Sequence, residues 1–186
     1  NGDGVIDDYD KMPIGFCDIP EITYGFGGAI EWKGFDVSIF FQGTARVSLF
    51  EEGSTIVPFS SGYKNNDGFL RGVMENRWTV DNPDPNARYP RTIRPSDALD
   101  NNNTKKSSFW VRNAAFLRLK NAEIGYTFPK RWMEKMAIQN LRLYVSGVNL
   151  LTWAPDVHLF DPDLGSGDGR KYPPTRVFNV GLNINF

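Results

Sequence analysis

The chain has 186 residues and a mass of 21.1 kDa, which is enough polypeptide for one or two domains. Its 21 Lys and Arg residues nearly balance its 22 Asp and Glu residues, so the formal net charge is −1 and a nucleic-acid-binding protein is not expected. The single cysteine, Cys17, excludes an internal disulfide scaffold and a thiolate metal cluster. No run of about 18 apolar residues is present, so we expect no helical membrane anchor in this chain, whereas a membrane-spanning β-sheet is compatible with the composition.

The first ten residues, NGDGVIDDYD, fit the spacing of an EF-hand calcium loop whose third position is Asn1. This register places oxygen donors at Asn1, Asp3, Val5 (through its carbonyl), Asp7 and Asp10. Asp10 stands where a longer Glu usually binds the ion with both oxygens, so we expect weak binding by this segment. The sequence therefore predicts a Ca²⁺ site that braces a loop, and the alternative is a polar turn without an ion.

Residues 22–32 alternate apolar side chains with small or polar ones, a period of two that predicts a strand with two different faces. Lys33-Gly34 predicts a tight turn. The returning strand places Phe35, Val37, Ile39 and Phe41 on one side, and we expect it to run on to about Phe50. The sequence therefore predicts a β-hairpin over residues 22–50, followed by a long loop over residues 51–115.

Three further strands are expected in residues 116–186. In the strand 116–128 the apolar residues change register near Lys120-Asn121, which predicts a β-bulge there. A short amphipathic helical turn is expected in 129–139, and a strand follows in 140–151. In the last strand, 177–186, every even position is apolar and the odd positions from Asn179 onward are polar or Gly.

The connections between these strands alternate strictly between long and short. Their lengths indicate an antiparallel up-and-down transmembrane β-barrel, in which long loops gather at one end and short turns at the other. About five strands cannot close a barrel, because the smallest bacterial barrels have eight, so we expect the chain to be part of a larger one. A β-sandwich also keeps one face apolar and is the alternative fold.

The order and spacing of several motifs resemble the C-terminal barrel segment of the SusC/RagA family, the TonB-linked outer-membrane transporters of Bacteroidetes. The resemblance rests on these segments: 1–10, PEITYG (20–25), GFDVS (34–38), FQG (41–43), SFWVRN (108–113), FLRLKN (116–121), GYTFP (125–129), NLLTW (149–153), DPD (161–163) and YP (172–173). Each motif is weak by itself, but their order and spacing together are specific. The match is poorest in 51–107, which leaves the substrate open.

The resemblance implies a barrel of roughly 22 strands with a plug domain that lies outside this chain. It further implies import of oligosaccharides or peptides across the outer membrane, energy delivered by TonB, and a SusD-like surface lipoprotein as partner. In this interpretation residues 1–21 are the calcium-type loop and an extracellular loop, residues 51–115 are a second extracellular loop, and residues 116–186 hold the last three strands.

Catalytic motifs are weak, so no enzyme is expected. The only histidine, His158, lies in a Pro- and Asp-rich loop, and the pair Asp161 and Asp163 is more typical of a turn than of a glycosidase. Aromatic loop residues are candidates for stacking on sugar rings: Phe59, Tyr63, Phe69, Trp78, Tyr89, Trp153 and Tyr172, with the last four predicted as substrate-binding. Alternatively, these rings pack the loops or form an aromatic belt at the membrane surface.

Two other functions remain open at this point. A soluble calcium-dependent carbohydrate-binding β-sandwich predicts a monomer that folds in water without detergent. A dockerin-type interaction module predicts a second calcium repeat, which the sequence does not contain.

Overall fold

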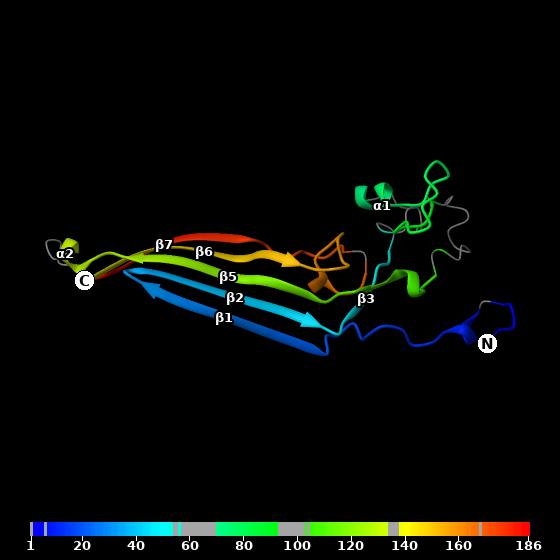
Figure 1. The fold of residues 1–186 in the computed structure, drawn as a ribbon, viewed down its shortest axis with the longest axis horizontal. Coiled ribbons are helices and arrows are strands. Elements are labelled where there is room, and N and C mark those ends of the chain that lie inside the picture. Colours follow the sequence, from blue (N-terminus) through cyan, green and yellow to red (C-terminus); the bar gives the residue numbers. More distant parts are fainter. Residues whose placement is uncertain are drawn as a thin grey trace. The chain divides into compact units, whose positions relative to one another are not determined.

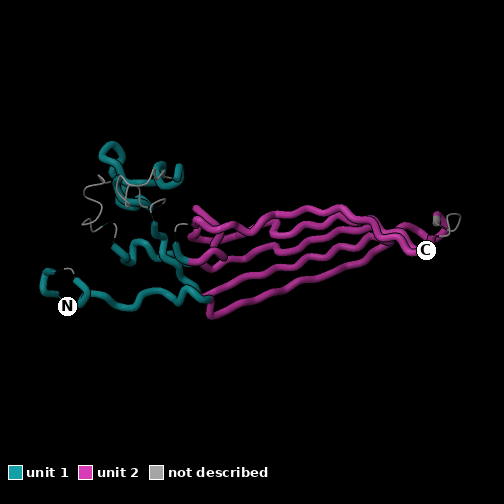
Figure 2. The backbone as a smooth tube through the Cα atoms, turned by 180° about the vertical axis from the view of Figure 1, so that it is seen from behind, with its two compact units in different colours: residues 1–19, 47–113, 166–168 teal, residues 20–46, 114–165, 169–186 magenta. Residues whose placement is uncertain are grey.

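The computed structural model describes residues 2–5, 7–53, 56, 70–92, 103, 105–133, 138–167 and 169–186. Asn1 and three of the candidate aromatic residues, Phe59, Tyr63 and Phe69, lie outside the described residues. The chain forms two compact units (Figure 2). Unit 1 comprises residues 1–19, 47–113 and 166–168, and unit 2 comprises residues 20–46, 114–165 and 169–186.

Unit 2 is an antiparallel sheet of five strands that lie side by side in chain order (Figure 1). The strands are β1 (Ile22–Trp32), β2 (Phe35–Ala45), β5 (Phe116–Thr127), β6 (Asn140–Trp153) and β7 (Val177–Asn185). This up-and-down order confirms the predicted fold class, and each strand is 9 to 14 residues long, close to the length that a tilted strand needs to cross a bilayer.

The predicted tight turn joins β1 to β2. Lys33 and Gly34 have φ angles of 50° and 87°, as in the type I′ turn that matches the twist of a hairpin. β2 is shorter than expected, because it ends at Ala45 and not near Phe50. The next residue, Arg46, has a φ of 54°, which takes the chain out of the extended conformation.

The predicted β-bulge is confirmed at Lys120. Phe40 pairs with Asn121 and the next residue, Phe41, pairs with Leu119, so Lys120 is the extra residue of β5. The pairing of β5 with β6 shifts at the same level. These shifts keep Leu117 and Leu119 on the same face as Ile124 and Tyr126, which an unbroken ladder would not do.

The connection between β5 and β6 contains α2 (Lys130–Met133), in agreement with the predicted helical turn. In the part of the chain that the structure describes, no helix has both the length and the apolar character to cross a membrane.

Unit 1 contains elements that the sequence did not predict. β3 (Ser48–Phe50) pairs antiparallel with β4 (Val111–Asn113), and α1 (Arg71–Glu75) lies between them in the sequence. Three 3-10 turns complete the described structure: η1 (Asp8–Asp10) and η5 (Ser108–Trp110) in unit 1, and η7 (Pro162–Leu164) in unit 2. The buried apolar residues of unit 1 are Val47, Leu49, Ile56, Val73, Tyr89 and Trp110.

Candidate functional site

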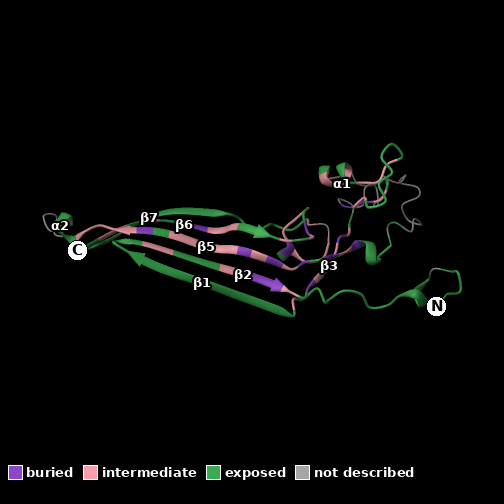
Figure 3. Cartoon of the chain, viewed as in Figure 1, coloured by how far each residue is buried: buried purple, intermediate pink, exposed green. Residues whose placement is uncertain are grey.

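The sheet of unit 2 has an apolar face that lacks charged residues at every paired position. This face consists of the side chains at the even positions of β1 and β7 and at the odd positions of β2. The strand register places the following residues on the same face: Leu117, Leu119, Ile124 and Tyr126 of β5, and Leu143, Val145, Leu151 and Trp153 of β6. We call this set the apolar face. Many of its side chains are exposed, among them Phe35 at 49%, Phe178 at 68% and Ile184 at 39% (Figure 3). In a β-sandwich, these three side chains would be buried between two sheets.

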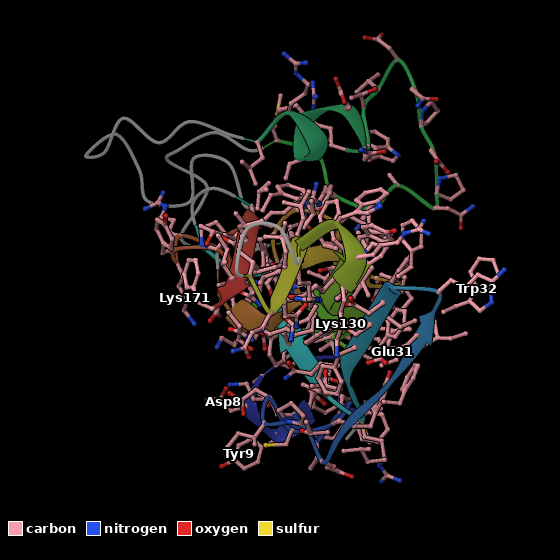
Figure 4. The ribbon with its side chains drawn as sticks, turned by 90° about the vertical axis from the view of Figure 1, so that its left-hand side faces the viewer. Asp8, Tyr9, Glu31, Trp32, Lys130 and Lys171 are labelled. Carbon is pink, nitrogen blue, oxygen red and sulfur yellow. The ribbon has the colours of Figure 1, made fainter. Side chains whose placement is uncertain are left out.

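Aromatic rings contact one another at two levels of the apolar face. At the end with the short turns, the rings of Phe35 and Tyr126 lie 4.6 Å apart and the Lys33 ammonium lies 4.8 Å from the Trp32 ring. Trp32 projects away from the sheet, opposite to its neighbour Glu31 (Figure 4). Near the middle of β1 and β2, Phe41 stacks on Phe26 at 5.1 Å, and Phe41 lies 6.4 Å from Trp153, the last residue of β6. Aromatic residues at the ends of an apolar band, such as Trp32 and Trp153, are typical of a transmembrane β-barrel.

The opposite side of the sheet, which we call the polar face, holds a charged cluster that spans three strands. Arg142 of β6 donates hydrogen bonds to Asp36 of β2 and, at 2.6 Å, to Glu123 of β5. Gly125 makes this crossing possible, because a Cβ there would lie 2.5 Å from the Arg142 Nη2 atom. Charged side chains on the lipid-facing wall of a barrel are costly, so a face with this cluster fits water or protein better than lipid.

The end of the polar face next to the long connections holds a buried arginine. Arg118 of β5 is 2% exposed. It donates hydrogen bonds to Thr152 at 3.0 Å, to Asp161 at 2.5 Å and to Asp163 at 3.3 Å. The two aspartates that the sequence offered as a catalytic pair are therefore ion-paired with an arginine, which argues for a structural role.

A second buried ion pair lies inside unit 1. The Glu51 side chain is fully buried, and its Oε2 atom accepts a hydrogen bond of 2.8 Å from Arg112. Tyr89 is 2% exposed, and burial together with the charge of Glu51 raises the pKa of its hydroxyl. The Tyr89 ring lies 6.5 Å from the ring of Trp110. This ring packs within unit 1, as the packing interpretation of the loop aromatics expects.

The remaining predicted substrate-binding residues have different surroundings. Trp78 is partly buried, and its backbone N–H donates to the Tyr89 carbonyl at 2.8 Å. Trp153 is 49% exposed and belongs to the apolar face, a position that fits the aromatic belt. Tyr172 is 84% exposed in the connection before β7. Of these four residues, Trp78 and Tyr172 are thus the two that are neither buried nor part of the apolar face.

The N-terminal segment folds through hydrogen bonds between carboxylates and backbone. Asp3 accepts from the Val5 N–H at 2.7 Å, Asp7 accepts from the Tyr9 N–H at 2.8 Å, and Asp10 accepts from the Asp7 N–H at 3.0 Å. This last bond lowers the pKa of the Asp10 carboxyl. Among the described residues, no group of three or more His, Cys, Asp or Glu side chains is placed to hold a metal ion. In the described part of the loop, three carboxylates thus each accept a hydrogen bond from a nearby backbone N–H.

Comparison with known proteins relates the chain to transporters of one type. No family model matches the sequence. Over its whole length the chain is 30% identical to the TonB-dependent receptors P26 and P3 of Formosa agariphila and 26% identical to the TonB-dependent receptor SusC of Bacteroides thetaiotaomicron. The chain spans only 17 to 19% of the length of these relatives.

Solved structures show the same fold. The RagAB peptide importer in its closed-closed state matches 93% of this chain and 18% of its own chain, with a TM-score of 0.67 and 24% identity. A second structure of the RagAB peptide transporter gives a TM-score of 0.65 at 24% identity and the same coverage. The up-and-down sheet with one apolar and one polar face is thus a fragment of the barrel of a TonB-dependent receptor. Within that class, the similarity to SusC and to the RagAB structures agrees with the resemblance of the chain to the SusC/RagA family.

Proposed function

We propose that the whole protein containing this chain is a TonB-dependent active transporter of the outer membrane that imports oligosaccharides or peptides. The observation that carries this proposal is the division of the five-stranded sheet into an exposed apolar face and an ion-paired polar face. In a barrel, the first faces lipid and the second faces a hydrated passage. The names of the relatives, TonB-dependent receptors and a peptide importer, support the same function.

Two partners follow from this proposal. A SusD-like surface lipoprotein closes over the barrel and delivers the substrate, and TonB supplies energy through parts of the protein outside this chain. The long connections all join the strands at the same end of the sheet, and the short turns lie at the opposite end. These long connections are residues 1–21, 51–115 and 154–176. Since long loops of bacterial barrels face outward, the end with the long connections is the extracellular one.

The substrate contacts that we propose in this chain are made by the exposed part of Trp78 and by Tyr172. Each presents an aromatic ring on a long extracellular connection, where a sugar ring or an apolar peptide side chain can stack on it. Alanine at each position is expected to raise the substrate concentration needed for half-maximal uptake without lowering the amount of protein in the membrane. Unchanged uptake by both variants would remove this role.

For the N-terminal loop we propose that the intact protein binds Ca²⁺ weakly, through the predicted donors and residues that precede Asn1 in the EF-hand pattern. The support is the ligand spacing of the sequence. Terbium luminescence of the full-length protein tests it: Asp7→Asn should weaken binding about tenfold, because it removes a ligand charge, whereas Asp8→Asn, at a position that supplies no ligand, should not. Equal effects of the two substitutions, or no binding at all, would leave the polar turn as the explanation.

The alternative of a soluble carbohydrate-binding β-sandwich is disfavoured by the exposure of the apolar face. Val180 in the centre of β7 is 75% exposed, and a soluble domain with such a face across five strands would aggregate. The relatives are receptors and transporters, which gives no support to an enzyme.

Uptake by whole cells tests the proposed function. Cells that carry the full-length protein should accumulate fluorescent oligosaccharides or fluorescent peptides, and deletion of its gene or of TonB should abolish the accumulation. A panel of both substrate classes decides between glycan and peptide import. Accumulation that does not depend on the protein, for every compound of the panel, would refute transport.

A further inference from the structure

The connection between β6 and β7 folds back onto the polar face of the sheet instead of extending away from it. Residues 154–165 follow β6 and include η7 (Pro162–Leu164), and this connection lies close to the beginning of β5 in Figure 1. We call residues 154–165 the inward segment. Arg118 places it: the register pairs Arg118 with Gln42 and with Thr152, both on the polar face. The carboxylates that bind Arg118 must therefore lie on that face as well.

The inward segment covers its anchor closely. Arg118 is 2% exposed although it carries a full positive charge, and its guanidinium also lies 4.9 Å from the ring of Phe116. Val157 and Pro162 of the segment are themselves buried, at 4% for Val157. Further along the same face the side chains Ser38, Phe40 and Asn121 are exposed, so the burial around Arg118 does not continue into the middle of the face.

The segment owes its local structure to the same contacts. The Asp161 carboxylate accepts hydrogen bonds from Arg118 and from the Asp163 N–H, at 2.5 and 3.0 Å. The Leu164 N–H donates to the Asp161 carbonyl at 3.1 Å, which closes η7. Charge-assisted hydrogen bonds of a buried arginine are strong, and removing the arginine would leave two carboxylates close together without a counter-charge.

We propose that Arg118 is a positioning residue that holds the inward segment over the polar face, so that this segment narrows the extracellular mouth of the barrel and limits the size of solutes that enter. This inference rests on the proposed transport function, because it takes the polar face to line the passage. A segment anchored at one buried arginine can also swing outward as a unit when Arg118 releases its carboxylates, which makes this contact the point at which the width of the mouth is set.

Hydrogen exchange of the full-length protein in lipid nanodiscs tests the anchoring step. In Arg118→Gln, the amides of Asp163 and Leu164 should exchange at least about tenfold faster than in the unchanged protein, since their acceptors lose the contact that fixes them. Arg142→Gln is the matched control, because it removes the same charge from the same face and does not contact the inward segment. Unchanged protection in Arg118→Gln, or equal loss in both variants, would overturn the inference.

Labelling from outside the cell tests the narrowing. In the full-length protein with Cys17→Ser, a cysteine introduced by Asn121→Cys lies on the polar face, three residues beyond Arg118 in the direction of the short turns. The ratio of its reaction with a maleimide carrying a polyethylene glycol chain to its reaction with a small maleimide should rise at least about tenfold on addition of Arg118→Gln. An unchanged ratio would contradict the narrowing. Neither experiment needs substrate uptake, so a failure of transport with both results as expected would refute the proposed function and not the position of the segment.

Discussion

An arginine in the middle of the apolar face should destabilise the membrane-inserted protein, whereas an arginine one residue away should not. Val180 lies five residues before Asn185, the end of β7. At about 3.3 Å per residue and a tilt of about 40°, this places Val180 about 13 Å into an apolar band about 25 Å tall. The side chain thus lies near the bilayer midplane, with 75% of its surface free of protein contacts.

The expected cost of Val180→Arg is about 2 to 4 kcal/mol, the cost of an arginine at the midplane of a barrel wall. Asn179→Arg is the matched control, because Asn179 belongs to the polar face, where it pairs with Ser146. Its expected cost is below about 1 kcal/mol, the range of most substitutions at hydrated positions. Urea unfolding of the full-length protein in lipid vesicles measures both values. Equal costs at the two positions, or no cost at Val180, would refute the assignment of the apolar face to lipid.

Three further predictions concern single residues. Gly27→Ala should destabilise the hairpin by about 1 to 3 kcal/mol, because a Cβ there would lie 2.4 Å from the Ile39 carbonyl oxygen; Gly28→Ala, which meets no atom within 4 Å, should be close to neutral, and urea unfolding compares the two. Glu51→Gln should lower the local free energy of unfolding by about 3 kcal/mol, because it breaks a buried ion pair, and should raise the hydrogen-exchange rate of the Glu51 amide about 100-fold. Glu52→Gln is the control, because the Glu52 side chain is 41% exposed and its loss should cost less than about 1 kcal/mol. Similar exchange rates in both variants would contradict a structural role for the buried pair. The lowered pKa of Asp10 predicts that its carboxylate stabilises η1 above pH 3.8 and that this contribution is lost as the pH falls through the lowered pKa. Titration of the carboxyl groups by NMR of selectively labelled protein measures this pKa. An Asp10 pKa at or above 3.8 would contradict the prediction.

The alternation of side chains was sufficient to predict the strands of unit 2, because a period of two over nine or more residues leaves little choice of structure. It also located the bulge at Lys120, since the apolar positions change register there and one face must stay apolar. The end of β2 at Ala45 was missed because the left-handed conformation of Arg46 has no strong sequence signal.

Contacts between distant parts of the sequence were not predictable in the same way. β3 and β4 have three residues each and are separated by 60 residues, so neither shows a measurable period. Arg118 and Asp161 carry opposite charges 43 residues apart, but nothing in the sequence selects this pairing from many others. For the loop aromatics, burial decided what composition did not: the ring of Tyr89 packs inside unit 1, and Trp153 belongs to the apolar face.

Spin labels placed singly along β7 of the full-length protein in lipid bilayers test the central claim most directly. Labels at the even positions Phe178, Val180, Leu182 and Ile184 should be relaxed by oxygen, which concentrates in lipid, and labels at the odd positions between them should be relaxed by a water-soluble nickel complex or shielded by protein. The account predicts this alternation over the whole strand. Even positions that nickel reaches as readily as odd ones, or that both reagents fail to reach, would show that the apolar face does not contact lipid.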